Sequence, residues 1–405
     1  MRTARLSTAE FIALTAMVSA MVAFAIDAML PALPGIAAEL SPDALNRAQL
    51  IVTSFVLGMG VGTLFTGPMS DAWGRKPVVI GGSALYAAGA ALAWAAGSLE
   101  LMLAARVIMG LGAAGPRVAA IAMVRDLYQG REMARIMSFC MTVFALVPAI
   151  APSLGALIIA GAGWRAIFPA FILFALVASL WLGLRQPETL APNVRRPLRA
   201  RLLWQGAVTT LSTPVARLSI LAQTLSLGML FTVLSSTQPV FDLTFGRGSE
   251  FPLWFMGISA CGALGSFVNA RAVMRFGIRR MVRIAYAAQV GMVALMILTL
   301  LLAVGTGVQF AVYLIWTTSV FVCVSMTLGN LNALLMEPLG HIAGLAASVS
   351  TSLATVGAVL IAVPIGQSFN GTPLPIAVGI GLAALTALVV AMRLGRGAAD
   401  GAAVR

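Results

Sequence analysis

Residues 67–76 read Gly67-Pro68-Met69-Ser70-Asp71-Ala72-Trp73-Gly74-Arg75-Lys76 and form a short charged connection between two long apolar segments. Charge is scarce elsewhere, because 60% of the 405 residues are hydrophobic and only 10% are charged. The glycines Gly67 and Gly74 allow close helix approach and a sharp reversal. Asp71 is expected to lie near a helix N-terminus, where an anion is favoured. The basic pair, Arg75 and Lys76, predicts that this turn lies on the cytoplasmic face of a membrane.

The composition of the whole chain indicates a membrane protein. Its mean hydropathy of +0.98 lies far above that of soluble domains. Apolar stretches of about 20 residues, long enough to cross ~30 Å of hydrocarbon, recur along the chain. The sequence predicts twelve spans, at residues 10–32, 48–70, 77–97, 100–124, 136–161, 164–185, 213–240, 251–271, 281–303, 308–334, 345–367 and 374–393. The first stretch is too long for a cleaved signal peptide, so we interpret it as the first span.

The net charge of +13 does not indicate a nucleic-acid-binding protein, because the basic residues are distributed as in a membrane protein. With the N-terminus inside the cell, only Arg47, Arg165 and Arg247 fall in outer loops, and Arg106 and Arg117 fall within a span. The other basic residues fall in cytoplasmic segments. This asymmetry predicts a multi-pass protein of the cytoplasmic (inner) membrane with both termini in the cytoplasm.

The chain divides into two halves around its one long polar connection, residues 186–212. The loop after the eighth span, Arg275-Phe276-Gly277-Ile278-Arg279-Arg280, repeats the aromatic, glycine and basic order of residues 73–76 without the acid. Such an echo is typical of an internal duplication. The sequence therefore predicts an all-α membrane protein with two pseudo-symmetric six-helix halves. The halves are residues 1–185 and 213–393, joined by a basic cytoplasmic linker, 186–212, and followed by a cytoplasmic tail, 394–405.

Three charged residues are predicted inside the hydrocarbon, where a charge is costly unless it is paired, hydrated or neutralised and therefore suggests function. Asp27 is the only acid well inside a span. Arg106, in the fourth span, is expected at a similar depth and is the natural partner of Asp27. Arg117 follows eleven residues later on the same helix face, about 16 Å away. We interpret Asp27, Arg106 and Arg117 as proton-coupling residues. The alternative is a structural helix–helix tie for Arg106 and a side chain that snorkels towards the inner end of the span for Arg117.

These motifs carry a resemblance to a known family. The loop at residues 67–76 resembles the signature loop of the major facilitator superfamily, between its second and third helices. Residues 27–34 resemble the first-helix pattern of the Bcr/CflA group of drug:proton antiporters. Residues 106–112 are similar to the fourth-helix motif of that group, in which the arginine is implicated in proton coupling. Residues 147–156, with Pro148, Pro152 and Gly155, resemble the antiporter motif, a proline–glycine kink expected to prevent leak, although Ala151 and Ala156 replace its usual glycines.

The resemblance implies a secondary transporter that works by alternating access. It would exchange an incoming proton for an outgoing small, largely hydrophobic compound or drug. A proton-linked transporter of one metabolite, such as an amino acid derivative or a sugar, is the alternative, and a membrane sensor or lipid-modifying enzyme is a third reading. No Walker-type nucleotide loop is found in the sequence. We therefore expect a proton gradient, rather than ATP, as the energy source. We also expect no enzymatic activity and no cofactor, and a monomer in the lipid bilayer.

The candidate substrate contacts are soft or polar side chains within spans, where helix packing is the alternative role for each. Those in the first half are Met21, Phe24, Phe55 and Met59, and those in the second half are Gln223, Gln238 and Asn330. No metal site is expected, because the three cysteines lie in separate spans and the single histidine, His341, lies in a loop.

Overall fold

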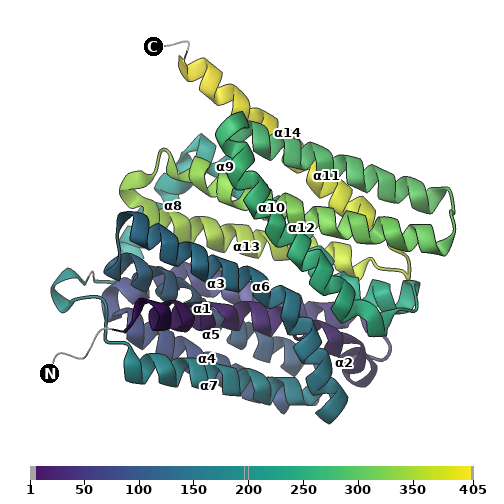
Figure 1. Ribbon diagram of the computed structural model, residues 1–405, viewed down its shortest axis with the longest axis horizontal. Coiled ribbons are helices and arrows are strands. Elements are labelled where there is room, and N and C mark those ends of the chain that lie inside the picture. Colours follow the sequence, from purple (N-terminus) through teal and green to yellow (C-terminus); the bar gives the residue numbers. More distant parts are fainter. Residues whose placement is uncertain (1–5, 196, 199, 403–405) are drawn as a thin grey trace. The chain divides into compact units, whose positions relative to one another are not determined.

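The computed structural model describes residues 6–195, 197–198 and 200–402, and its helices form two compact units, Met1–Trp204 and Gln205–Arg405 (Figure 1). Within this described part of the chain, twelve segments are helical, long and apolar enough to cross a membrane, and no residue lies in a β-strand. Helices suit this composition because every backbone N–H and C=O must be satisfied internally in hydrocarbon. The predicted all-α fold with twelve spans is confirmed.

The first unit holds the first six spans, coloured purple to teal in Figure 1. They are α1 (Thr8–Asp27), continued by η1 (Leu30–Ala32) and α2 (Leu33–Leu40); η2 (Leu45–Gln49) with α3 (Leu50–Trp73); α4 (Arg75–Trp94); α5 (Leu99–Leu127); α6 (Gly130–Ala162); and η3 (Trp164–Ala166) with α7 (Ile167–Arg185). The connection to the second unit contains a short turn, η4 (Pro192–Val194), and a helix, α8 (Ala200–Ser212). The two units therefore divide inside residues 186–212, and this stretch is partly helical.

The second unit holds the remaining six spans, coloured green to yellow in Figure 1. They are α9 (Pro214–Pro239), continued by the π-helical η5 (Val240–Thr244); η6 (Gly248–Glu250) with α10 (Phe251–Phe276); α11 (Ile278–Leu301); α12 (Thr306–Met336); η7 (Gly340–Ile342) with α13 (Ala343–Gln367); and α14 (Leu374–Ala402). The last helix continues past residue 393, so residues 394–402 of the predicted tail are helical.

Both units pack their helices in the same order, as expected for duplicated halves. In the first unit, α1 contacts α5, α6 and α7, while α5 contacts α3 and α4, and α4 contacts α7. In the second unit, α9 contacts α12, α13 and α14, while α12 contacts α10 and α11, and α11 contacts α14. Each pair in one unit has its counterpart in the other, which confirms the pseudo-symmetry that the echoed loop predicts.

The two echoed loops share a backbone conformation. Gly74 ends α3 and begins α4 with φ +109° and ψ 162°, and Gly277 does the same between α10 and α11 with φ +77° and ψ 155°. Residues with a Cβ atom rarely adopt these positive φ values, so glycine is favoured at both turns. Each loop also pairs an arginine with an acid near the end of a later span, Arg75 with Asp126 and Arg279 with Glu337.

Candidate functional site

The first span is discontinuous, and Asp27 lies at its break. Helix α1 ends at Asp27, and the chain continues through a single 3₁₀ turn into α2. Pro31 and Pro34 lack backbone N–H groups, so they cannot continue the hydrogen-bond ladder of α1. The far end of α2 is anchored separately, because Glu39 accepts hydrogen bonds from Trp164 Nε1 (2.8 Å) and from Arg165 Nη1 (2.5 Å).

Arg106 closes the broken end of α1. Its Nη2 donates to the carbonyl oxygen of Ala25 at 3.0 Å, and its Nε donates to the carbonyl oxygen of Ile51 on α3 at 3.1 Å. The last four carbonyls of a helix have no partner within that helix, and a cation is favoured beside them. The guanidinium also lies over the ring of Phe55, 4.5 Å from its centroid. Arg106 is completely buried and joins α5 to α1 and α3.

The predicted ion pair between Asp27 and Arg106 is absent. The two residues do come to the same depth, because Arg106 bonds to a carbonyl two residues before Asp27. However, no hydrogen bond or ion pair joins the Asp27 carboxylate to any residue within the described ranges, although its side chain is only 4% exposed. The guanidinium instead donates to two backbone carbonyls, one in the last turn of α1 (Ala25) and one in the first turn of α3 (Ile51). The described part of the chain therefore holds a buried acid and a buried base at a similar depth, with no hydrogen bond or ion pair between their side chains.

Two glycines allow neighbouring helices to approach the break closely. A Cβ atom at Gly155 of α6 would overlap the carbonyl oxygen of Ala28, directly after Asp27. A Cβ atom at Gly110 of α5 would overlap the carbonyl oxygen of Phe55 on α3. Gly155 belongs to the predicted antiporter motif, whose two prolines, Pro148 and Pro152, lie within α6. The motif helix thus packs directly against the broken end of the first span.

Arg117 lies further along α5, where it is partly buried. Its Nη1 is 3.4 Å from the sulfur of Met59. Among the described residues, no acid lies within ion-pair distance of Arg117. The helix therefore carries two arginines on one face, one held by backbone carbonyls and one contacting a thioether.

The candidate substrate residues of the first unit have different surroundings. Met21, Phe55 and Met59 are buried. Phe24 packs against two rings of α7, with centroids 5.4 Å from Phe171 and 5.3 Å from Phe174. The ring of Phe24 therefore contributes to packing between the first and sixth spans.

The candidate polar contacts of the second unit are all largely buried. The side chain of Gln223 accepts a hydrogen bond from Ser350 at 3.5 Å, while its Nε2 lacks a partner. Gln238 Oε1 also lacks a partner. Asn330 Nδ2 donates to Asn269 Oδ1 at 2.8 Å, so this amide joins α12 to α10.

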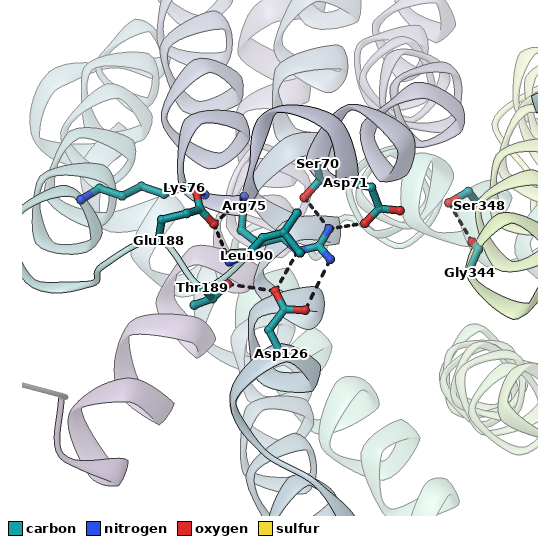
Figure 2. A network of polar contacts seen from close by, with 10 residues as sticks. All are labelled: Ser70, Asp71, Arg75, Lys76, Asp126, Glu188, Thr189, Leu190, Gly344 and Ser348. Atoms are coloured by element: carbon teal, nitrogen blue, oxygen red, sulfur yellow. Dashed lines mark hydrogen bonds and ion pairs between the residues drawn. The ribbon is translucent and has the colours of Figure 1, made fainter. Parts of the chain in front are cut away.

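The signature loop is organised around the side chain of Arg75 (Figure 2). Its Nη1 donates to Asp71 at 2.5 Å and to Ser70 Oγ at 3.1 Å, and its Nε donates to Asp126 at 2.9 Å. Asp126 lies near the end of α5 and also accepts a hydrogen bond from Thr189 Oγ1 at 2.9 Å. One largely buried guanidinium therefore joins α4 to α3 and α5, and Asp126 extends these contacts to the segment after α7. Gly67, predicted as part of this loop, lies within α3, about two turns before its end at Trp73.

The acid at the N-terminus of α4 is Glu188 rather than Asp71 (Figure 2). Its carboxylate accepts hydrogen bonds from the backbone N–H groups of Arg75 (3.0 Å) and Lys76 (3.1 Å), and from Leu190 (3.0 Å). A Cβ atom at Gly74 would lie 2.5 Å from Glu188 Oε2, so glycine also leaves room for this cap. Lys76 Nζ donates to the carbonyl oxygen of Gly183 on α7 at 2.7 Å. The expected anion at a helix N-terminus is present, but a different residue supplies it.

Sequence reasoning did not assign roles to Asp126 and Glu188. The available signal was their position, since each is an acid directly after a predicted span in a predominantly basic cytoplasmic segment. His341 is exposed in η7, and Cys140, Cys261 and Cys323 are free thiols. Within the described ranges, no group of three or more histidine, cysteine or acidic residues could hold a metal ion.

Comparisons with known proteins agree with these features. The family model described as Major Facilitator Superfamily matches residues 13–362. The bicyclomycin resistance protein homolog of Haemophilus influenzae is 32% identical over 302 residues, which cover 74% of this chain and 75% of the relative. The chloramphenicol resistance protein of Pseudomonas aeruginosa is 33% identical over 276 residues, covering 67% and 63%.

Among solved structures, the crystal structure of a D-xylose-proton symporter matches with a TM-score of 0.76 over 94% of this chain and 97% of that chain. At 15% identity, this likeness shows the shared fold alone. The family match and the resistance-protein relatives show that the chain is a transporter of the Major Facilitator Superfamily, in its Bcr/CflA-type drug efflux group.

Proposed function

We propose that the chain exchanges protons for small, largely hydrophobic compounds and exports them across the cytoplasmic membrane by alternating access. Relatives named for resistance to bicyclomycin and chloramphenicol favour drug-like substrates over a single metabolite. The observation that carries the coupling proposal is Asp27, a buried acid at the break of the first span with no cationic partner among the residues that the structure describes.

The coupling cycle is proposed as an exchange of partners at the end of α1. An ionised carboxylate without a partner is costly to bury, so the observed arrangement suits a protonated Asp27. Loss of the proton would create an anion close to Arg106, which now bonds to Ala25 and Ile51. The guanidinium would then turn towards Asp27 and release the carbonyls, which changes the geometry of the break. Arg117 would offer a second cationic position along α5.

The signature-loop network is proposed as the element that holds one end of the first unit rigid. Arg75 joins α3, α4 and α5. Glu188, in the connection that follows α7, caps the N-terminus of α4. Opening of the transporter at the cytoplasmic side would have to break or move these contacts as a group. We also propose that Pro148, Pro152 and Gly155 keep α6 against the break, so that proton and drug movements stay coupled.

The remaining features of the proposal follow from the sequence. Basic residues concentrate in segments assigned to the cytoplasm, which supports an inner-membrane protein with both termini inside. The proton gradient would supply the energy without a cofactor, and the functional unit would be a monomer. Met21, Phe24, Phe55 and Met59 are proposed as apolar substrate contacts, and Gln223, Gln238 and Asn330 as polar contacts.

Everted membrane vesicles provide the test. Vesicles acidified inside should accumulate several unrelated hydrophobic antibiotics, which compete with one another, and should not accumulate sugars or amino acid derivatives. Asp27→Asn should abolish uphill accumulation, whereas Asp43→Asn, which changes an exposed acid, should leave it intact. Continued uphill accumulation by Asp27→Asn would show that Asp27 is not the coupling acid. Saturation by one polar solute would replace the drug-export proposal with the metabolite alternative.

A further inference from the structure

Helix α8 (Ala200–Ser212) is a separate element in the connection that leads into the seventh span. Thr213 interrupts it with an extended backbone, φ −80° and ψ 116°, and α9 then begins at Pro214. Because α9 is a membrane span, the helix that directly precedes it ends close to the membrane boundary. A helix of 13 residues extends about 20 Å, enough to lie along that boundary.

One face of α8 packs against protein. Gly206 and Thr210, four residues apart, are buried, and Thr210 Oγ1 donates to the carbonyl oxygen of Gly206 at 2.7 Å. A Cβ atom at Gly206 would overlap the side chain of Leu345 on α13, so glycine sets the close approach. This contact fixes which way the opposite face of α8 points.

The opposite face of α8 is apolar and exposed. Trp204, Val208 and Leu211 are 72%, 48% and 40% exposed. Their spacing of four and then three residues places them in one stripe, and at about 100° per residue this stripe lies opposite Gly206 and Thr210. A second stripe with the same spacing is polar and also exposed, and it consists of Gln205, Thr209 and Ser212. The exposed surface of α8 is therefore amphipathic.

The sequence on both sides of the apolar stripe is basic. Between Glu188 and Asp242 the sequence contains five arginines and no acidic residue. Arg201 lies one turn before Trp204, and Arg217 lies in the first turn of α9; both are exposed. Tryptophan favours the interface between membrane and water, and arginines near that surface are attracted to anionic lipids. This charge complementarity selects one occupant for the stripe.

We propose that α8 is an interfacial helix that lies on an anionic membrane surface. Trp204, Val208 and Leu211 insert at the boundary between headgroups and acyl chains, while Arg201 and Arg217 contact lipid phosphates. The connection between the two units would then be held to the membrane through α8, independently of any proton coupling. The inference requires only that the adjacent helices span the membrane.

Spin labels on the intact protein in lipid nanodiscs test the proposal. Cys140, Cys261 and Cys323 are first replaced by serine, and one cysteine is then introduced at position 204, 208 or 211, or at the matched positions 205, 209 and 212. In discs containing phosphatidylglycerol, labels on the apolar stripe should respond more to oxygen, which dissolves in lipid, than to a water-soluble nickel complex. Labels on the polar stripe should show the reverse preference.

The other outcomes contradict the proposal. Equal exposure of both stripes to the nickel complex would show that α8 projects into water. Protection of the apolar stripe from both reagents would show that protein, either another part of this chain or a second copy, covers it.

A second experiment tests whether the insertion of α8 depends on anionic lipid. Labels on the apolar stripe should lie deeper in discs with phosphatidylglycerol than in discs of phosphatidylcholine alone. Arg201→Gln should reduce this difference, whereas Arg131→Gln, which removes an exposed arginine at the start of α6, should not. An equal depth in both lipids, or an equal effect of the two substitutions, would overturn the assignment to an anionic surface.

Discussion

The guanidinium of Arg106 donates a hydrogen bond to the carbonyl oxygen of Ala25, two residues before the buried acid Asp27. A base on the fourth span therefore stabilises the broken end of the first span, through the backbone rather than through the acid. The contact ties the position of Arg106 to the conformation of the break. Any movement of Arg106 on α5 would therefore alter contacts with α1 and α3 together.

Replacement of Arg106 should destabilise the first unit. Arg106→Ala leaves the carbonyls of Ala25 and Ile51 buried without this donor, a loss of about 1–3 kcal/mol for each unsatisfied group. Arg106→Lys should recover only part of this loss, because an ammonium lacks the planar fork that reaches both oxygens. The unfolding temperature in detergent should fall clearly more for Arg106→Ala than for Arg117→Ala, since Arg117 contacts only a methionine sulfur.

The same variant tests the proposed exchange of partners. Drug added to the purified wild-type protein should release protons, with a midpoint that can be followed across pH. Arg106→Ala should shift that midpoint or abolish the release, because the anion formed at Asp27 would lack its cation. An unchanged midpoint would reduce Arg106 to a structural tie between helices.

Gly155 should be intolerant of a side chain. Gly155→Ala places a methyl group against the carbonyl oxygen of Ala28, and overpacking of this kind costs about 1–3 kcal/mol. We expect a lower unfolding temperature and weaker drug accumulation in vesicles. Gly161→Ala is the matched control, because nothing lies within 4 Å of its added Cβ atom in the same helix. Equal effects of the two substitutions would show that the close approach of α6 to the break is unimportant.

The Arg75 network should control access from the cytoplasm. Asp71→Asn or Asp126→Asn removes one carboxylate partner of Arg75, which should favour states open at that end. A cysteine replacing Met59 should then react faster with a membrane-impermeant reagent applied from the cytoplasmic side. Asp43→Asn, which alters an exposed acid, should leave the rate unchanged. Identical labelling rates in all variants would argue that the network has no gating role.

Glu188 should protect the first turn of α4. Each hydrogen bond to a charged group contributes about 1.5–3 kcal/mol, so Glu188→Gln should increase amide hydrogen exchange at Arg75, Lys76 and Leu190 by roughly tenfold or more. Mass spectrometry can resolve this segment. Glu132→Gln, an exposed acid at the start of α6, should not affect it. Unaltered protection would indicate that α4 holds its first turn without the cap.

The sequence predicted most of the scaffold because its signals are local. Long apolar stretches define spans, and a glycine followed by basic residues defines each echoed turn. The relation between Asp27 and Arg106 was predicted only in depth. Depth follows from counting residues along a helix, but the partners of a buried guanidinium depend on which backbone carbonyls of neighbouring helices lie within its reach. The role of Glu188 was missed because its partners, Arg75 and Lys76, lie more than one hundred residues away along the chain.

The two units share their helix contacts and the irregular ends of their first helices, α1 and α9, but they do not share their buried charges. Helix α12, the counterpart of α5, contains no charged residue, and α9 contains only Arg217, in its first turn. An ancestral pair of identical units would have carried the aspartate and arginine either twice or not at all. The present chain has them once, although an irregular helical segment follows the first helix of both units. The repeated helix packing therefore does not require a repeated pair of buried charges.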